Sequence, residues 1–158
     1  MESRNDLFRA IPIFDSGLTD DEIRSFSVKH KEGQGLVNYL YGYAETDEEN
    51  NVMRTYIVRD NYSNEFVGYF SLKAGMISIN EQKIGEKEYF DTLPGVEIAN
   101  FAINKGYIDR NSEMRGIGII VFDELIKPLI EKAGDIVGTK LIYIFSLPLD
   151  LSILFSQT

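Results

Sequence analysis

The stretch VEIANFAINKGYIDRNSEMRGIG, residues 96–118, decides the fold. Its first part, residues 96–103, is a short apolar run that predicts a buried strand. A polar connection follows, and residues 113–118 (EMRGIG) predict a glycine-rich turn that opens a helix. The first N–H groups of a helix lack intrahelical acceptors and lie at the positive end of its dipole, and glycines let the backbone approach a ligand. This order of elements predicts a phosphate-binding turn.

The residues after the turn predict a helix and then another strand. From residue 117 to about 133, apolar residues recur at helical spacing and form one stripe, and Pro128 predicts a kink because it has no N–H for the carbonyl of Glu124. Residues 141–145 (LIYIF) predict a short apolar strand. Strand, helix and strand at this spacing favour a right-handed parallel crossover. We therefore expect an α/β fold.

The chain before residue 96 predicts an antiparallel sheet with helices near its start. Residues 7–14 predict an edge strand, and the capping-box pattern from Thr19 to Glu22 predicts a helix that starts at Asp20. A second helix is expected over residues 36–44, and an acidic loop over 45–51. Residues 54–59 and 66–74 predict a hairpin joined by a turn at 60–64, with a later turn at 93–95.

Composition narrows the class of protein. The chain has 158 residues, which fits one domain, and it contains no cysteine and one histidine. These counts exclude disulfides, argue against a metal site, and together with an N-terminus unlike a signal peptide favour the cytoplasm. The formal net charge is −9, which argues against nucleic acid as partner and favours a small-molecule or peptide amine. A membrane is not expected either, because no apolar run approaches the roughly 20 residues that span one.

With these elements, the chain resembles the GCN5-related N-acetyltransferase (GNAT) superfamily. The family motif Gln/Arg-x-x-Gly-x-Gly/Ala matches Glu113-x-x-Gly116-x-Gly118, with glutamate at the first position. The resemblance implies a single GNAT-like domain over residues 1–158, with N-terminal strands and helices in 1–75 and an acyl-CoA-binding core in 96–146. It implies a mixed sheet, an antiparallel half followed by a parallel β-α-β unit, in which strands four and five splay apart.

The resemblance also implies the cosubstrate and the residues that hold it. Acetyl-CoA would bind with its pyrophosphate on the backbone of the turn, at Arg115, Gly116, Ile117, Gly118 and Ile119. Its pantetheine arm would pair with the strand edge formed by Phe101, Ala102 and Ile103. Candidates for neutralising the phosphates are Lys105, Arg110, Lys127 and Lys140.

Glu97 is the candidate general base for an N-acetyltransferase that moves acetyl to a primary amine. Strand alternation places Glu97 on the same face as Phe101 and Ile103. An apolar strand removes hydration from a carboxylate, which suits a base that works near neutral pH, although an edge glutamate in solvent is the alternative. Asn100 orients a substrate or water, or else satisfies a strand bulge.

The C-terminal residues differ from the family pattern. The family continues past its fifth strand with a helix that carries a thiolate-protonating tyrosine and with two more strands, whereas here only LPLDLSILFSQT follows Ser146, and no tyrosine follows Tyr143. We therefore expect a C-terminally truncated relative, with the last two strands absent, which associates with itself through the edge of the fifth strand. A catalytically impaired acyl-CoA-binding module, acting as a sensor or interaction partner, is the alternative to an active enzyme.

Overall fold

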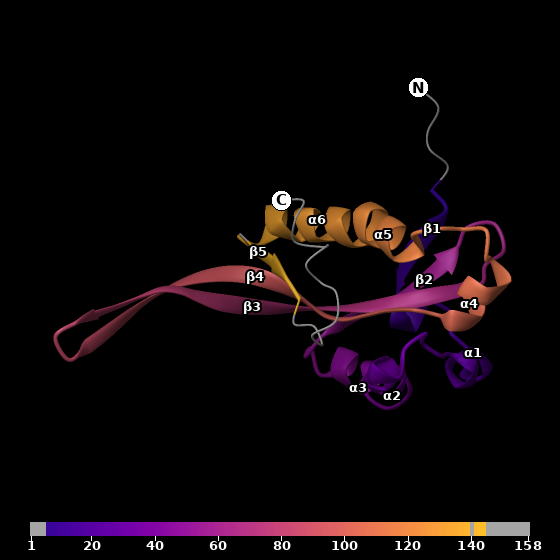
Figure 1. The fold of residues 1–158 in the computed structure, drawn as a ribbon, viewed down its shortest axis with the longest axis horizontal. Coiled ribbons are helices and arrows are strands. Elements are labelled where there is room, and N and C mark those ends of the chain that lie inside the picture. The colour runs from indigo at the N-terminus through magenta and orange to yellow at the C-terminus, as the bar shows by residue number, and fades with distance from the viewer. Residues whose placement is uncertain (1–5, 140, 145–158) are drawn as a thin grey trace, which may run out of the picture.

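The strands form one five-stranded sheet in the order β1-β2-β3-β4-β5. In the computed structural model, which describes residues 6–139 and 141–144, the first four strands are antiparallel to their neighbours and β5 is parallel to β4 (Figure 1). The strands are β1 (Phe8–Pro12), β2 (Arg54–Asp60), β3 (Phe66–Ile84), β4 (Lys87–Ile103) and β5 (Leu141–Tyr143). The predicted fold class is confirmed, and the expectation about two final strands falls on residues outside those described.

Helices cover both faces of this sheet (Figure 1). One face carries α1 (Asp20–Ser25), α2 (Gln34–Gly42) and α3 (Ala44–Glu49), and the other carries α5 (Ile117–Val121), a π-helical turn (Phe122–Ile126) and α6 (Lys127–Ile136). A short helix, α4 (Lys105–Arg110), follows β4 and was not expected from the sequence. Within the described ranges, no helix is long and apolar enough to cross a membrane.

The predicted start of α1 is confirmed in detail. The side chain of Thr19 accepts a hydrogen bond from the backbone N–H of Glu22 at 3.1 Å, and the Glu22 carboxylate accepts from the N–H of Thr19 at 3.1 Å. This reciprocal pair satisfies donors that the first turn leaves free.

The predicted acidic loop at 45–51 is wrong, because α3 occupies most of it. Ala44 is 1% exposed and anchors the helix, while Asp47 accepts a hydrogen bond from Tyr39 at 2.9 Å. Glu48 also contacts the body, because its carboxylate accepts a hydrogen bond from the backbone N–H of Thr55 at 3.0 Å. These contacts outweigh the polar composition of the segment.

The turn predicted at 93–95 is also wrong. Strands β3 and β4 continue past that point and turn at Gly85, whose φ is +67°, so that they form a long two-stranded arm beyond the body (Figure 1). Pro94 pairs in register with Met76. A proline is tolerated there because pairing with β5 begins only at Gly95, so that β4 is an edge strand at Pro94 among the described residues.

The predicted helix from residue 117 is present but irregular. It runs to Ile136, and its irregularity is a π-helical turn immediately before Lys127 and Pro128. Pro128 cannot donate to the carbonyl of Glu124, and a widened turn is one way for a helix to absorb that missing bond. The effect of Pro128 thus lies in the preceding turn.

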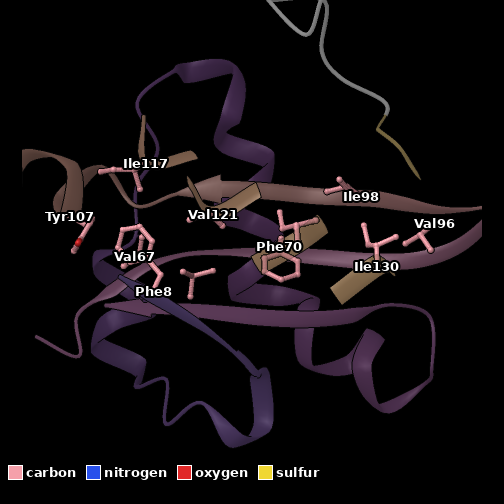
Figure 2. Close-up of a cluster of buried hydrophobic side chains, with 11 residues drawn as sticks. Phe8, Val67, Phe70, Val96, Ile98, Tyr107, Ile117, Val121 and Ile130 are labelled. Atoms are coloured by element: carbon pink, nitrogen blue, oxygen red, sulfur yellow. The ribbon is translucent and has the colours of Figure 1, made fainter. Parts of the chain in front are cut away.

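Two apolar clusters fix the helices to the sheet. The larger lies between the sheet and α5–α6 (Figure 2) and the smaller between the sheet and α1–α3. The buried members of the larger are Phe8, Val58, Val67, Phe70, Val96, Ile98, Tyr107, Ile117, Val121, Ile126 and Ile130. Those of the smaller are Ile13, Phe26, Leu40, Ala44, Ile57, Phe66, Tyr69 and Ala102. A strand side chain in the larger cluster therefore faces α5–α6, and one in the smaller cluster faces α1–α3.

Candidate active site

The glycine turn has the geometry that an anion requires. Gly116 precedes α5 with φ +65°, a left-handed conformation that favours glycine. The N–H of Ile120 donates to the carbonyl of Gly116 at 3.0 Å, and the N–H groups of Ile117, Gly118 and Ile119 precede that first bond of the helix. Ile117 is 6% exposed and anchors the turn in the larger cluster. The backbone N–H groups of the turn are thus held in place by the packing of Ile117.

This turn packs directly against β4. A Cβ built on Gly118 would lie 3.9 Å from side-chain atoms of both Phe101 and Ile103. Both residues pack against the larger cluster, whereas Ala102 is buried in the smaller one. The structure therefore brings the two predicted cofactor segments, 101–103 and 115–119, into contact.

Among the described residues, one edge of β4 is free beside this turn. Within the same ranges, β5 pairs with Gly95, Val96 and Glu97. From Ile98 to Ile103, β4 pairs with β3 on one side and with no strand on the other among the described residues. An extended ligand with amide groups can pair with such an edge.

Glu97 lies at the point where β4 and β5 separate. It is the last residue of β4 to pair with β5, opposite Tyr143, and it is 9% exposed. One of its carboxylate oxygens lies 3.1 Å from the ammonium nitrogen of Lys73 on β3. This ion pair holds the Glu97 carboxylate in place.

The expected alternation along β4 is interrupted by one inserted residue. Leu72 pairs with Ile98 and the preceding residue, Ser71, pairs with Asn100. Ala99 therefore has no partner of its own on β3 and forms a β-bulge.

The predicted common face of Glu97, Phe101 and Ile103 is therefore wrong. Ile98 and Phe101 both face the larger cluster, on the α5–α6 side, although an uninterrupted strand would place them on opposite faces. Glu97, next to Ile98, faces the α1–α3 side, and the bulge brings Asn100 to that same side. The turn and the candidate base thus lie on opposite faces of the sheet.

Tyr143 lies on the same side as Glu97 but away from the open edge. Its flanking residues Ile142 and Ile144 pack against the larger cluster, so its ring faces the other way. A Cβ built on Gly75 would overlap the hydroxyl of Tyr143, which therefore lies over the base of the arm.

Several polar residues on the glutamate side were missed by sequence reasoning. Thr55 and Ser71 are buried with their hydroxyl oxygens 2.8 Å apart. Burial and the hydrogen bond to Asp47 raise the pKa of Tyr39 to about 12, so its hydroxyl remains a donor at neutral pH. A signal was available in FVGYFSLKA, where Ser71 and Lys73 place polar side chains at alternate positions of an apolar strand.

The candidate cations for the phosphates are mostly engaged elsewhere. Lys105 pairs with Asp109 at 2.8 Å, and Arg110 pairs with Glu65 at 2.7 Å. Lys127 begins α6, three helical turns from Gly116 at about 5.4 Å per turn. Lys140 lies outside the described residues.

Comparisons with known proteins identify the fold. No family model matches this sequence, and no curated protein is significantly similar to it. Among solved structures, a mutant AtaT toxin bound to the C-terminus of the antitoxin AtaR and acetyl-CoA aligns with TM-score 0.65 and 18% identity, over 95% of this chain and 82% of that chain. AtaT complexed with acetyl-methionyl-tRNAfMet aligns with TM-score 0.62 and 17% identity, over 92% and 81%. The KacTA–DNA complex aligns with TM-score 0.61 and 17% identity, over 89% and 76%. The predicted GNAT-like fold is confirmed.

The same structures correct the prediction about partners. Neighbours of this fold form complexes with acetyl-methionyl-tRNA and with DNA, so excluding nucleic acid in favour of a small-molecule or peptide amine is wrong. The exclusion was drawn from the net charge of −9, which averages over the whole surface and says nothing of local basic segments. The expected self-association through the edge of β5 stays a prediction.

Proposed function

We propose that this protein transfers the acetyl group of acetyl-CoA to the α-amino group of an aminoacyl-tRNA. The observation that carries the proposal is the edge of β4 that no strand covers in the described part of the chain, with the glycine turn on one face and Glu97 on the other. The structural neighbours support the ligands, because their complexes contain acetyl-CoA and acetyl-methionyl-tRNA.

The residues of the turn fit acetyl-CoA. The backbone N–H groups of residues 115–119 (Arg115, Gly116, Ile117, Gly118 and Ile119) would hold the pyrophosphate at the start of the helix. The free edge at 101–103 would pair with the amides of the pantetheine arm. Both segments meet at Gly118, so one ligand can contact both. Acetyl-CoA supplies the acetyl group as an activated thioester.

Glu97 would act as the general base from the opposite face. The acceptor amine must lose a proton before it attacks, and the Glu97 carboxylate takes that proton, directly or through water. The amine nitrogen then forms a bond to the acetyl carbon, the bond from that carbon to sulfur breaks, and the second amine proton neutralises the departing thiolate. The base site is thus reached by the amine without crossing the bound arm.

A short basic segment lies where RNA would approach. Lys29, His30 and Lys31 are consecutive and exposed, on the side of the sheet that carries α1–α3. The N–H of Lys105 donates to the carbonyl of Ser27 at 2.8 Å, which holds this segment beside the end of β4. Phosphate contacts by a few such residues support RNA binding even on an acidic protein.

Transfer of labelled acetyl from acetyl-CoA to methionyl-tRNA tests the proposal. Glu97→Gln should lower kcat by about 10²- to 10⁴-fold while the affinity for acetyl-CoA stays within about twofold. Glu131→Gln, an exposed glutamate on α6, is the matched control and should leave both unchanged. Binding of acetyl-CoA without transfer to any amine would favour the alternative, an acyl-CoA-binding module.

Whether the acceptor is an RNA is tested by removing positive charges from the basic segment and by varying the salt concentration. If RNA phosphates contact the basic segment, Lys29→Gln with Lys31→Gln should raise KM for methionyl-tRNA and flatten its dependence on salt. The same variant should acetylate methionine methyl ester as the wild type does. Equal effects on both acceptors would contradict a role in binding RNA.

A further inference from the structure

A row of polar side chains crosses the sheet and ends at the open edge of β4. Thr55 of β2 pairs in register with Ser71 of β3, and Ser71 pairs in register with Asn100 of β4. The neighbouring residues on this face, Ile57, Tyr69 and Ala102, belong to the smaller apolar cluster. Polar groups in such a position add little net stability, so the row points to a ligand.

The bulge at Ala99 is what places Asn100 in this row. Without it, Asn100 would face the α5–α6 side, opposite to Glu97. With it, an amide and a carboxylate share one face on the segment of β4 where pairing with β5 ends. Bulges next to active sites commonly redirect a side chain in this way.

The side-chain amide of Asn100 can donate a further hydrogen bond. Its nitrogen lies 3.8 Å from the sulfur of Met53, and this is the one hydrogen bond recorded for its side chain in the part of the chain that the structure describes. A thioether is a weak acceptor, so a carbonyl oxygen can replace it at little cost. The side chain is half-buried, so a ligand at the open edge of β4 can reach it.

The surroundings of Asn100 are held in place by the helices. The hydroxyl of Tyr39 lies 2.9 Å from the carboxylate of Asp47 and 3.4 Å from the sulfur of Met53. The ring of Tyr39 stacks on Tyr69, with ring centres 6.4 Å apart and planes 14° apart. Met53 is thus fixed against Asn100 by packing and hydrogen bonds.

We propose that Asn100 selects an acceptor with a carbonyl group next to its amine. The side-chain N–H of Asn100 donates to the carbonyl oxygen of an α-aminoacyl group, while Glu97 takes the proton of the α-amino group. The inference rests on the proposed function and deepens it, because it explains why an α-amine is chosen over a side-chain amine. An amine without an adjacent carbonyl makes only the contact to Glu97.

Two small acceptors test the proposal kinetically. Methionine methyl ester has the adjacent carbonyl, and 3-(methylthio)propylamine has the same side chain and amine without it. The wild type should prefer the ester by about 10-fold in kcat/KM, and Asn100→Ala should remove most of that preference through KM. Asn38→Ala, on the exposed surface of α2, is the matched control and should keep the preference. A preference that survives in Asn100→Ala would overturn the proposal.

A binding measurement on the wild type covers the case in which Asn100→Ala fails to fold or no amine is acetylated. In the presence of CoA, methionine amide should shift the side-chain amide NMR signal of Asn100, and 3-(methylthio)propylamine should not. A shift without any acetyl transfer would support the inference and contradict the proposed function. Transfer to the ester with no shift would contradict the inference and leave the proposed function standing.

Discussion

Glu97 and Phe101 lie on opposite faces of β4, because Ala99 is inserted as a bulge between them. Phe101 contacts the glycine turn, and Glu97 faces the polar row and Lys73. The glycine turn and the candidate base therefore lie on opposite faces of the sheet, where pairing of β4 with β5 ends.

Removing the partner of Glu97 should slow the reaction. Lys73 lies 3.1 Å from the Glu97 carboxylate and holds it in place. In Lys73→Met the carboxylate loses this contact, so kcat should fall by about 10-fold while the Kd for acetyl-CoA stays within about twofold. Steady-state kinetics and calorimetry would measure the two quantities, with Lys132→Met, an exposed lysine on α6, as control. A kcat unchanged from the wild type would count against Glu97 as the base.

Replacing Gly116 should weaken binding of acetyl-CoA. Gly116 and Gly17 both have φ +65°, so alanine at either position should cost about 1 kcal/mol of folding free energy. Only Gly116→Ala should also raise the Kd for acetyl-CoA in calorimetry, because Gly17 lies before α1 and away from the turn. If both variants bind acetyl-CoA as the wild type does, the turn does not hold the pyrophosphate.

Removing the charge of Glu113 should strengthen binding of acetyl-CoA. Glu113 is exposed two residues before Arg115, at the start of the turn, where a carboxylate repels a pyrophosphate. Glu113→Gln should lower the Kd by up to about fivefold, the effect of about 1 kcal/mol near a helix N-terminus. Glu131→Gln, on α6, should leave the Kd unchanged. Weaker binding in Glu113→Gln would show that Glu113 supports the turn.

Stability should fall in acid through two carboxylates. Hydrogen bonds from Arg59, at 2.8 and 3.0 Å, lower the pKa of Glu22 despite its partial burial. Burial alone would raise the pKa of Asp60, but hydrogen bonds from Tyr107 and from the N–H groups of Tyr62 and Ser63 outweigh it and lower that pKa. Because both folded-state values lie below the unfolded ones, the stabilisation is complete above about pH 5 and is lost as pH falls through the folded values.

Glu22→Gln separates the two contributions. At pH 7 it should lower the free energy of unfolding by about 2 kcal/mol, because Arg59, 4% exposed, keeps a buried charge without its partner. Between about pH 7 and pH 3 the variant should lose less stability than the wild type in urea unfolding. Parallel losses in the two proteins would assign the acid sensitivity to other groups.

The sequence predicted the turns and the helix start whose conformation depends on neighbouring residues. The capping box at Thr19, the hairpin turn after Asp60 and the glycine turn at Gly116 each depend on residues within a few positions, and each is present. The parallel pairing of β4 with β5 followed from the helix between them.

The features that were missed depend on tertiary contacts. The bulge at Ala99 is a mismatch between two strands. Asn100 suggested a bulge as one interpretation, but its effect on the faces was not foreseen, so alternation placed Glu97 on the wrong face. Helix α3 forms because Ala44 and Asp47 contact the body of the protein, against an acidic composition. The acidic net charge led to a wrong exclusion because binding depends on the local surface.

The central claim is that the acetyl group passes from acetyl-CoA to the α-amino group of an aminoacyl-tRNA. The most direct test incubates the protein with acetyl-CoA and methionyl-tRNA, digests the RNA with ribonuclease and identifies the 3′-terminal nucleoside by mass spectrometry. We expect N-acetylmethionyl-adenosine with the wild type and strongly reduced amounts of it with Glu97→Gln. Unmodified methionyl-adenosine with the wild type, under conditions where acetyl-CoA is bound, would contradict it.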